Sequence, residues 1–221
     1  MISRLVHIPA GPSGTISLEG MLELPENATG VVLFAHGSGS SRLSPRNNYV
    51  ARVLRDAGLG TLLIDLLTQY EDTDYATRFD IPVLTRRLLA ATRWLHNEPA
   101  TLSLAIGYFG ASTGAAAALQ AAAEEGKKIA AVVSRGGRPD LAGEEALNRV
   151  AAPTLLIVGG FDDVVIGLNQ EAHSALRCEK ELIAIPGATH LFEEPGTLEQ
   201  VAKYAANWFG KFMPRSGVES R

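Results

Sequence analysis

The stretch LAIGYFGASTGAAAALQAAAEEG, residues 104–126, decides the fold of this chain. Its first part, Leu104–Phe109, is an almost continuous apolar run, which is typical of a strand covered on both faces. Its last part, Thr113–Glu125, is rich in alanine and ends at Gly126, which predicts a helix packed tightly on a sheet. Between them, Gly110–Gly114 has the form G-x-S-x-G, which in this setting predicts a sharp turn that exposes its serine.

The alternation of apolar runs and helical patterns continues on both sides of this stretch. Further strands are expected at Thr15–Leu24, Val31–Ala35, Gly60–Asp65, Ile129–Ser134, Thr154–Val158 and Glu181–Ile185. Further helices are expected at Pro45–Ala57, Ile81–His96, Asp140–Arg149, Ile166–Arg177 and Thr197–Phe212. Strands that alternate with helices predict an α/β fold with a doubly wound, mostly parallel sheet. Thr15–Leu24 instead alternates in polarity, so with Leu5–Ile8 it is expected to form an antiparallel hairpin at the edge.

One domain is expected over residues 1–213, followed by a flexible polar tail over residues 214–221. Between the strands that end near Ser134 and begin near Thr154 there is room for only a short helix, which predicts no cap domain and an open site. The N-terminus lacks a stretch like a signal peptide, and no run approaches the roughly 20 apolar residues of a membrane span. With one cysteine, Cys178, these features predict a cytoplasmic location and no membrane partner.

The net charge of -4 and the scattered basic residues argue against a nucleic-acid partner. No cluster of His, Cys or Asp has the spacing of metal ligands, so neither a metal nor another cofactor is predicted. The remaining partner class is a small-molecule substrate. The sequence predicts no particular oligomeric state.

Three residues at strand ends form the candidate catalytic set. Ser112 lies in the G-x-S-x-G turn, and its neighbouring glycines have neither the spacing of a dinucleotide fingerprint nor a P-loop lysine after them. Asp162 follows the strand Thr154–Val158 and would orient a base, although Asp163 beside it is the alternative. His190 follows the last strand and has the chemistry of a general base.

The loop after Val31–Ala35 is the candidate oxyanion hole. It contains His36-Gly37-Ser38-Gly39, and a turn of this type commonly supplies a backbone N–H to a developing oxyanion. We expect the N–H groups of Ser38 and Thr113 to form the hole, with Gly37 or Gly39 as alternatives to Ser38. One such donor typically lowers the barrier by about 3–4 kcal/mol.

Four arginines, Arg42, Arg46, Arg135 and Arg138, lie on loops expected near this end of the sheet. A guanidinium can hold a carboxylate or phosphate with two parallel hydrogen bonds. Arg46 and Arg138 are therefore the candidates to bind an anionic acyl substrate. The alternative is that the arginines pair with acidic residues and fix the loops.

Five blocks of the sequence together resemble the dienelactone hydrolase-like branch of the α/β-hydrolase superfamily. They are FAHGSGSSRLSPRN (Phe34–Asn47), GYFGASTGA (Gly107–Ala115), SRGGRPD (Ser134–Asp140), LLIVGGFDDVV (Leu155–Val165) and THLFEEPG (Thr189–Gly196). The resemblance implies an eight-stranded sheet and a triad of Ser112, Asp162 and His190. Dienelactone hydrolases proper carry a cysteine nucleophile where this chain has Ser112, so the resemblance does not imply dienelactone as the substrate.

The leading hypothesis is hydrolysis of a carboxylic ester or related acyl bond through an acyl-enzyme on Ser112. Acyl transfer to an alcohol or thiol would use the same residues and differ only in the acceptor. A non-catalytic binding protein on a hydrolase fold and a nucleotide-binding protein are the hypotheses from other classes.

Overall fold

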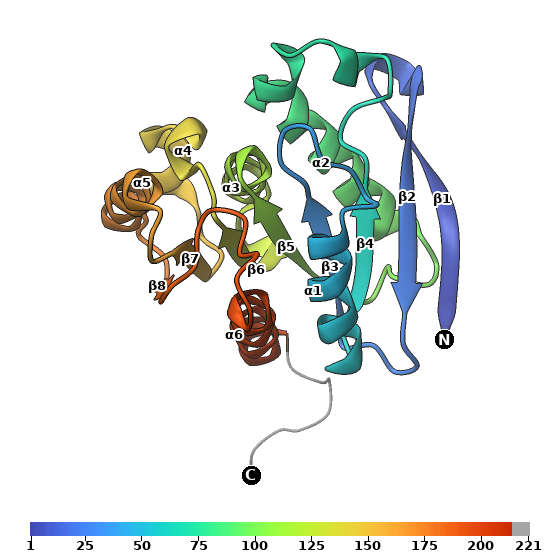
Figure 1. Cartoon of the computed structure of the whole chain (residues 1–221). Coiled ribbons are helices and arrows are strands. Elements are labelled where there is room, and N and C mark those ends of the chain that lie inside the picture. The colour runs from blue at the N-terminus through green and yellow to red at the C-terminus, as the bar shows by residue number, and fades with distance from the viewer. Residues whose placement is uncertain (214–221) are drawn as a thin grey trace.

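A computed structural model of the chain describes residues 1–213, and the predicted tail 214–221 lies outside the described residues. A central sheet has the strand order β1-β2-β4-β3-β5-β6-β7-β8 (Figure 1). The strands are β1 (Ile2–Ala10), β2 (Ile16–Leu24), β3 (Gly30–Ala35), β4 (Gly60–Ile64), β5 (Ala105–Ala111), β6 (Ile129–Arg135), β7 (Thr154–Gly159) and β8 (Lys180–Ile185). The pairs β1–β2 and β2–β4 are antiparallel and the other pairs are parallel. The mostly parallel eight-stranded sheet with an antiparallel N-terminal edge is thus confirmed.

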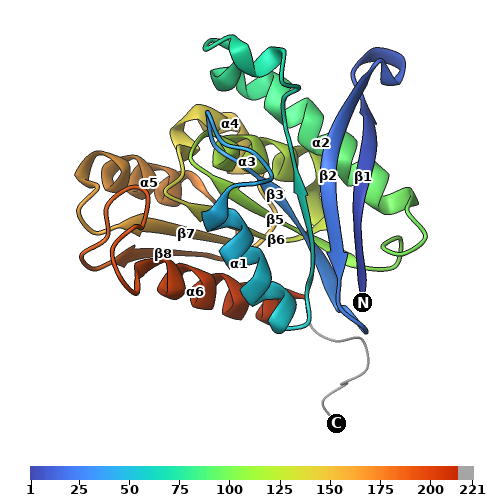
Figure 2. The same cartoon turned by 45° about the vertical axis from the view of Figure 1, so that its right-hand side comes forward.

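Helices cover both faces of the sheet. One face carries α1 (Pro45–Asp56) and α6 (Thr197–Phe212), and the other carries α2 (Ile81–Asn97), α3 (Thr113–Glu125), α4 (Glu144–Arg149) and α5 (Asp163–Ala175) (Figures 1 and 2). The buried side chains accordingly form two apolar clusters, one beneath each helical layer. Strands β3, β4 and β7 are buried along their whole length, because both of their faces are covered.

Most elements lie within two residues of their predicted bounds, and three differ more. The predicted helix Asp140–Arg149 divides into a 3₁₀ turn at Pro139–Ala142 and α4, because Gly143 between them has a φ of 82°, which no helix accommodates. Helix α5 begins three residues earlier than predicted, directly after Asp162. Strand β1 extends beyond the predicted Leu5–Ile8 at both ends.

The segment between β6 and β7 contains only these two short helical pieces, so residues 1–213 carry no extra cap. Within the same residues, none of the helices combines the length and the apolar character that a bilayer crossing needs. The carboxyl ends of the parallel strands meet at one edge of the sheet, where α/β proteins bind their ligands. The candidate residues are found at this edge.

Candidate active site

Ser112 occupies a strained turn between β5 and α3, which is called the elbow below. Its backbone has φ 50° and ψ −122°, a left-handed conformation that is rare for a residue other than glycine and costs about 1–3 kcal/mol. Close backbone contacts hold the turn. A Cβ at Gly110 would lie 2.5 Å from Ala115 Cα, and one at Gly114 would lie 2.2 Å from the carbonyl oxygen of Ala35. The two glycines of the motif are therefore required by packing on either side of the serine.

His190 and Asp162 form a hydrogen-bonded pair. His190 lies in the loop between β8 and α6, and its Nδ1 is 2.7 Å from Asp162 Oδ2. Asp162 directly follows the β7 loop and is the N-cap position of α5, where its side chain caps no backbone N–H. The carboxylate is largely buried and the imidazole is partly exposed. Of the two candidate aspartates, Asp162 is the one in contact with the imidazole, and Asp163 is exposed on α5.

The loop after β6 contacts both Ser112 and His190. The Ser112 N–H donates to the carbonyl of Arg135 at 3.3 Å, and the Arg138 N–H donates to the carbonyl of Ser112 at 3.1 Å. A Cβ at Gly136 would lie 3.5 Å from His190 Cε1. Among the described residues, no hydrogen bond joins the Ser112 hydroxyl directly to the imidazole. The structure therefore places both residues against one loop, without a closed relay between them.

The candidate oxyanion loop follows β3 and lies against the serine. A Cβ at Gly37 would be 2.9 Å from Ser112 Cβ, which shows how closely the loop approaches. The Ser38 N–H, predicted as an oxyanion donor, donates to Thr113 Oγ1 at 3.0 Å. This amide therefore points at the N-terminus of α3, and the Thr113 hydroxyl is its partner in the structure.

His36 fixes this loop to the neighbouring strand. Its Nε2 accepts the Leu66 N–H at 3.0 Å, just beyond β4, and its Nδ1 lies 2.9 Å from the carbonyl oxygen of Gly37, to which it donates. Burial lowers the pKa of His36 below the ordinary value of 6.5, so the ring is neutral at pH 7 and uses one nitrogen as donor and the other as acceptor. His36 thus supports the loop, and the proton-transfer chemistry is left to His190.

The arginines predicted to bind substrate differ in how far they are already paired. Arg138 donates from Nε and Nη2 to both carboxylate oxygens of Asp140, at 2.9 and 2.7 Å. Arg46 donates to the exposed Glu193 at 3.0 Å, but its Nε is buried without a partner. Arg42 is held by two carboxylates at the β2–β4 edge. Loop fixation, the alternative, therefore describes Arg138 and Arg42, and Arg46 keeps unused donor capacity.

Arg135 was not among the substrate-binding candidates, yet its environment is the most unusual of the four. It ends β6, beside the elbow strand β5, and is only 8% exposed. No carboxylate in residues 1–213 pairs with it, and its buried Nη1 has no hydrogen-bond partner. Burial, and then repulsion by Arg46, lowers the pKa of Arg135 to about 10. A buried cation without a counter-ion is unfavourable.

Residues 1–213 contain no group of three or more His, Cys, Asp or Glu side chains arranged to hold a metal ion. Cys178, the remaining candidate nucleophile by chemistry, lies near the start of β8, and its Sγ is 3.7 Å from Thr154 Oγ1. In the sheet, β6 and β7 separate β8 from β5, the strand that ends at the elbow.

Comparisons with known proteins place this geometry in context. Residues 18–212 match the dienelactone hydrolase family. Two curated proteins from Mycobacterium tuberculosis strains, named provisionally as phosphoribosyl transferases, are 58% identical over 204 residues, which is 92% of this chain and 45% of theirs. This chain therefore spans less than half the length of those relatives. A crystal structure of dienelactone hydrolase from Anabaena variabilis is 56% identical, with a TM-score of 0.91 over 96% of this chain and 98% of that one.

A more distant similarity concerns the fold alone. A serine hydrolase without lid from Xanthomonas campestris is 19% identical, with a TM-score of 0.77 over 96% of this chain and 95% of that chain. Its architecture agrees with the open sheet edge seen here.

Proposed function

The chain belongs to the dienelactone hydrolase family, and we propose that it is a hydrolase that cleaves carboxylic esters or related acyl compounds through an acyl-enzyme on Ser112. His190 acts as the general base and Asp162 orients it. One observation carries the proposal. A strained serine elbow and a histidine–carboxylate pair at 2.7 Å occur together at the carboxyl ends of the parallel strands.

The proton transfers follow from the hydrogen bond of His190. With Nδ1–H donated to Asp162, Nε2 carries a lone pair and accepts the proton of Ser112 as the serine oxygen attacks the acyl carbon. The resulting imidazolium, stabilised by the carboxylate, gives the proton to the leaving alkoxide. Water then repeats the attack and releases the acid. The step requires Ser112 Oγ and His190 Nε2 to approach when substrate binds, as catalytic hydrogen bonds commonly tighten in the Michaelis complex.

The oxyanion of the tetrahedral intermediate is proposed to lie at the N-terminus of α3. There the Thr113 N–H, at the first helical position, has no intrahelical partner, and the helix dipole favours negative charge. The Ser38 N–H is the second proposed donor. Since the Thr113 hydroxyl accepts from this amide at 3.0 Å, the developing oxyanion must replace the hydroxyl as acceptor.

The substrate is proposed to carry an anionic group on its acyl side. Arg135 is buried beside the elbow with an unpartnered Nη1, and Arg46 has an unpartnered, buried Nε. Burial and, after it, repulsion by Arg46 disfavour the charge of Arg135, and an anionic group of the substrate that bound there would offset both effects. Arg138 is left out of this proposal, because Asp140 already occupies both of its forked donors.

A fluorophosphonate probe tests the nucleophile. The wild-type protein is expected to be labelled covalently, the Ser112→Ala variant is expected to lose the label, and the matched Cys178→Ala variant is expected to keep it. Hydrolysis of 4-nitrophenyl acetate should follow the same order. A folded wild-type protein that neither takes the label nor hydrolyses the ester would refute the proposal and favour a non-catalytic binding protein.

A pair of esters of equal length tests the substrate class. The monoester of succinic acid with 4-nitrophenol carries a carboxylate where 4-nitrophenyl butyrate carries a methyl group. We expect the acidic ester to have the higher kcat/KM, and Arg135→Gln to lower this preference roughly 30-fold or more, since a buried charge pair is broken. Arg138→Gln is the control and should leave the preference unchanged. A wild-type preference for the neutral ester would refute the anionic subsite.

Two other activities are distinguished by their products. Acyl transfer would use the same residues, so added alcohol would yield a new ester instead of the acid. Hydrolysis is favoured because the carboxyl edge of the sheet is uncapped and open to water. The phosphoribosyl transferase name of the curated relatives concerns proteins more than twice the length of the matched part. We do not extend it to this chain, whose elbow geometry is suited to attack on an acyl carbon.

A further inference from the structure

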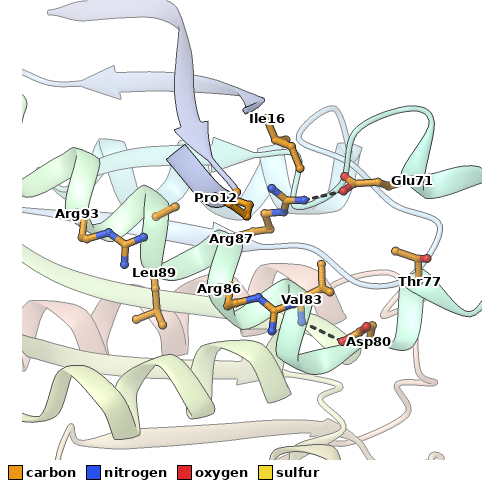
Figure 3. Close-up of a pocket in the computed structure, with 12 residues that line it drawn as sticks. Pro12, Ile16, Glu71, Thr77, Asp80, Val83, Arg86, Arg87, Leu89 and Arg93 are labelled. Carbon is orange, nitrogen blue, oxygen red and sulfur yellow. Dashed lines mark hydrogen bonds and ion pairs between the residues drawn. The ribbon is translucent and has the colours of Figure 1, made fainter. Parts of the chain in front are cut away.

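A cavity of about 680 Å³ lies beside the linker that joins β4 to α2 (Figure 3). Its walls come from the segment that joins β1 to β2, the linker and the part of α2 from Val83 to Arg93, and none of the residues of the proposed active site lines it. The volume is in the range of small-molecule sites, about 300–1,000 Å³. The cavity is therefore large enough for a ligand of its own.

The charges around the cavity do not balance. Three arginines of α2, Arg86, Arg87 and Arg93, line it together with two acidic residues, Glu71 and Asp80. Both carboxylates are engaged: Glu71 lies 2.6 Å from Arg87 Nη2, and Asp80 accepts a backbone N–H in the first turn of α2 at 3.0 Å. The exposed side chains of Arg86 and Arg93 form no ion pair or hydrogen bond within residues 1–213. The Asp80 carboxylate keeps its charge while it caps the helix, so three guanidiniums and two carboxylates leave a net charge of +1 around the cavity, and among the described residues the guanidiniums of Arg86 and Arg93 are unpaired.

Arg87 adds a buried donor to the same wall. Its side chain is 7% exposed, and its buried Nη1 has no hydrogen-bond partner although Nη2 is paired with Glu71. Figure 3 shows its guanidinium lying between Pro12, Ile16 and Glu71. An unsatisfied buried N–H is unfavourable, and a ligand oxygen that reached it would satisfy it.

The rest of the lining is apolar. Pro12 and Ile16, near the turn between β1 and β2, line the cavity together with Leu89 and Ala90 of α2. Leu89 and Ala90 are nearly buried, so they form a floor that a hydrocarbon group can cover. The site thus combines an apolar floor with an excess of guanidinium groups.

We propose that this cavity is a binding site for a small amphipathic phosphomonoester, separate from the proposed active site. The phosphate oxygens accept from the unpaired guanidiniums of Arg86 and Arg93 and from the buried Arg87, and the excess of guanidinium over carboxylate groups attracts the negative charge. The organic body covers the apolar floor. Phosphate is favoured over carboxylate because three guanidiniums offer more donors, from more directions, than the two oxygens of a carboxylate accept.

Isothermal titration calorimetry with hexyl phosphate tests the proposal on the full chain carrying Ser112→Ala, which prevents turnover. Saturable binding is expected, with hexanoate and hexanol binding at least roughly tenfold more weakly. The double variant Arg86→Gln/Arg93→Gln should weaken the affinity for hexyl phosphate roughly tenfold or more, without a change in unfolding temperature. The matched control is Arg52→Gln, on α1 at the opposite face, where Arg52 lies 5.2 Å from the Tyr49 ring centroid.

A further variant separates this site from the proposed active site. Arg135→Met should leave the affinity for hexyl phosphate unchanged, and the double variant in the wild-type background should hydrolyse 4-nitrophenyl acetate at the wild-type rate. No binding at millimolar concentration, equal affinity in the double variant, equal affinity for hexanoate, or loss of affinity in Arg135→Met would each overturn the proposal. None of these outcomes depends on whether Ser112 is the nucleophile.

Discussion

Replacing Arg135 with methionine should make the protein more stable, although the residue lies beside the proposed active site. Burial, with repulsion from Arg46, lowers the pKa of Arg135 from 12.5 to about 10. At about 1.4 kcal/mol per pKa unit, the charged form is disfavoured in the folded state by about 3 kcal/mol. Because the folded pKa lies below the unfolded one, the whole of this destabilisation is present at pH 7 and is relieved only as the pH rises through about 10. Methionine removes the charge and fills similar space.

The expected gain is therefore about 3 kcal/mol in the free energy of unfolding, measured by urea denaturation at pH 7 with tryptophan fluorescence. For a chain of this size it corresponds to an increase in Tm of roughly 6–12 °C. The control is Arg138→Met, where the arginine side chain is 37% exposed and paired with Asp140, and a change within about 0.5 kcal/mol is expected. A loss of stability in Arg135→Met would show that the buried guanidinium is satisfied and would refute the argument for an anion there.

Three further predictions concern the elbow and its supports. Asp162→Asn should lower kcat for ester hydrolysis roughly 10³- to 10⁴-fold with little effect on folding. The matched control, Asp163→Asn, should leave kcat within about twofold of wild type. Comparable losses in both variants would contradict the pairing of Asp162 with His190. Because the pKa of His36 is lowered in the folded state, the unfolded state binds the proton first as the pH falls, and the free energy of unfolding should decline below about pH 6.5. In His36→Gln this decline with pH should be less steep. Identical slopes in urea denaturation of the two proteins would exclude His36 as the cause. Gly114→Ala should reduce the free energy of unfolding by several kcal/mol in urea denaturation, because its Cβ would lie 2.2 Å from the Ala35 carbonyl oxygen, and a variant as stable as wild type would show that the contact can relax.

The elbow and the adjacent elements were predictable because their causes are local. The turn at Ser112 and the bounds of Thr113–Glu125 follow from residues within a few positions of each other, and the structure has the same helix bounds. The same holds for Thr197–Phe212, whose apolar face repeats with helical period. The absence of a cap within the described residues followed from the short distance between two strands. By contrast, the division of Asp140–Arg149 at Gly143 depends on a backbone angle that the sequence pattern does not specify.

The roles of the charged and polar residues were less predictable, because the fold decides which of several possible partners each one contacts. Arg138 was a substrate-binding candidate, but Asp140, only two residues further on, occupies its guanidinium. Nothing in the sequence distinguishes Arg135 from the other three arginines, because its lack of a carboxylate partner depends on every residue packed around it. Likewise, the partner of the Ser38 amide lies 75 residues away, on Thr113. A sequence shows where charges are, but the fold decides which of them remain uncompensated.

The turn at Ser112 is shaped by its neighbours and not by the serine itself. Gly110 and Gly114 approach the backbone of Ala115 and Ala35, and these contacts exist whatever atom ends the side chain between them. Exchange of oxygen for sulfur at this position would therefore leave the scaffold unchanged while altering the electronic character of the attacking group. Proteins that share this fold can thus change the nucleophilic atom without changing the backbone turn that positions it.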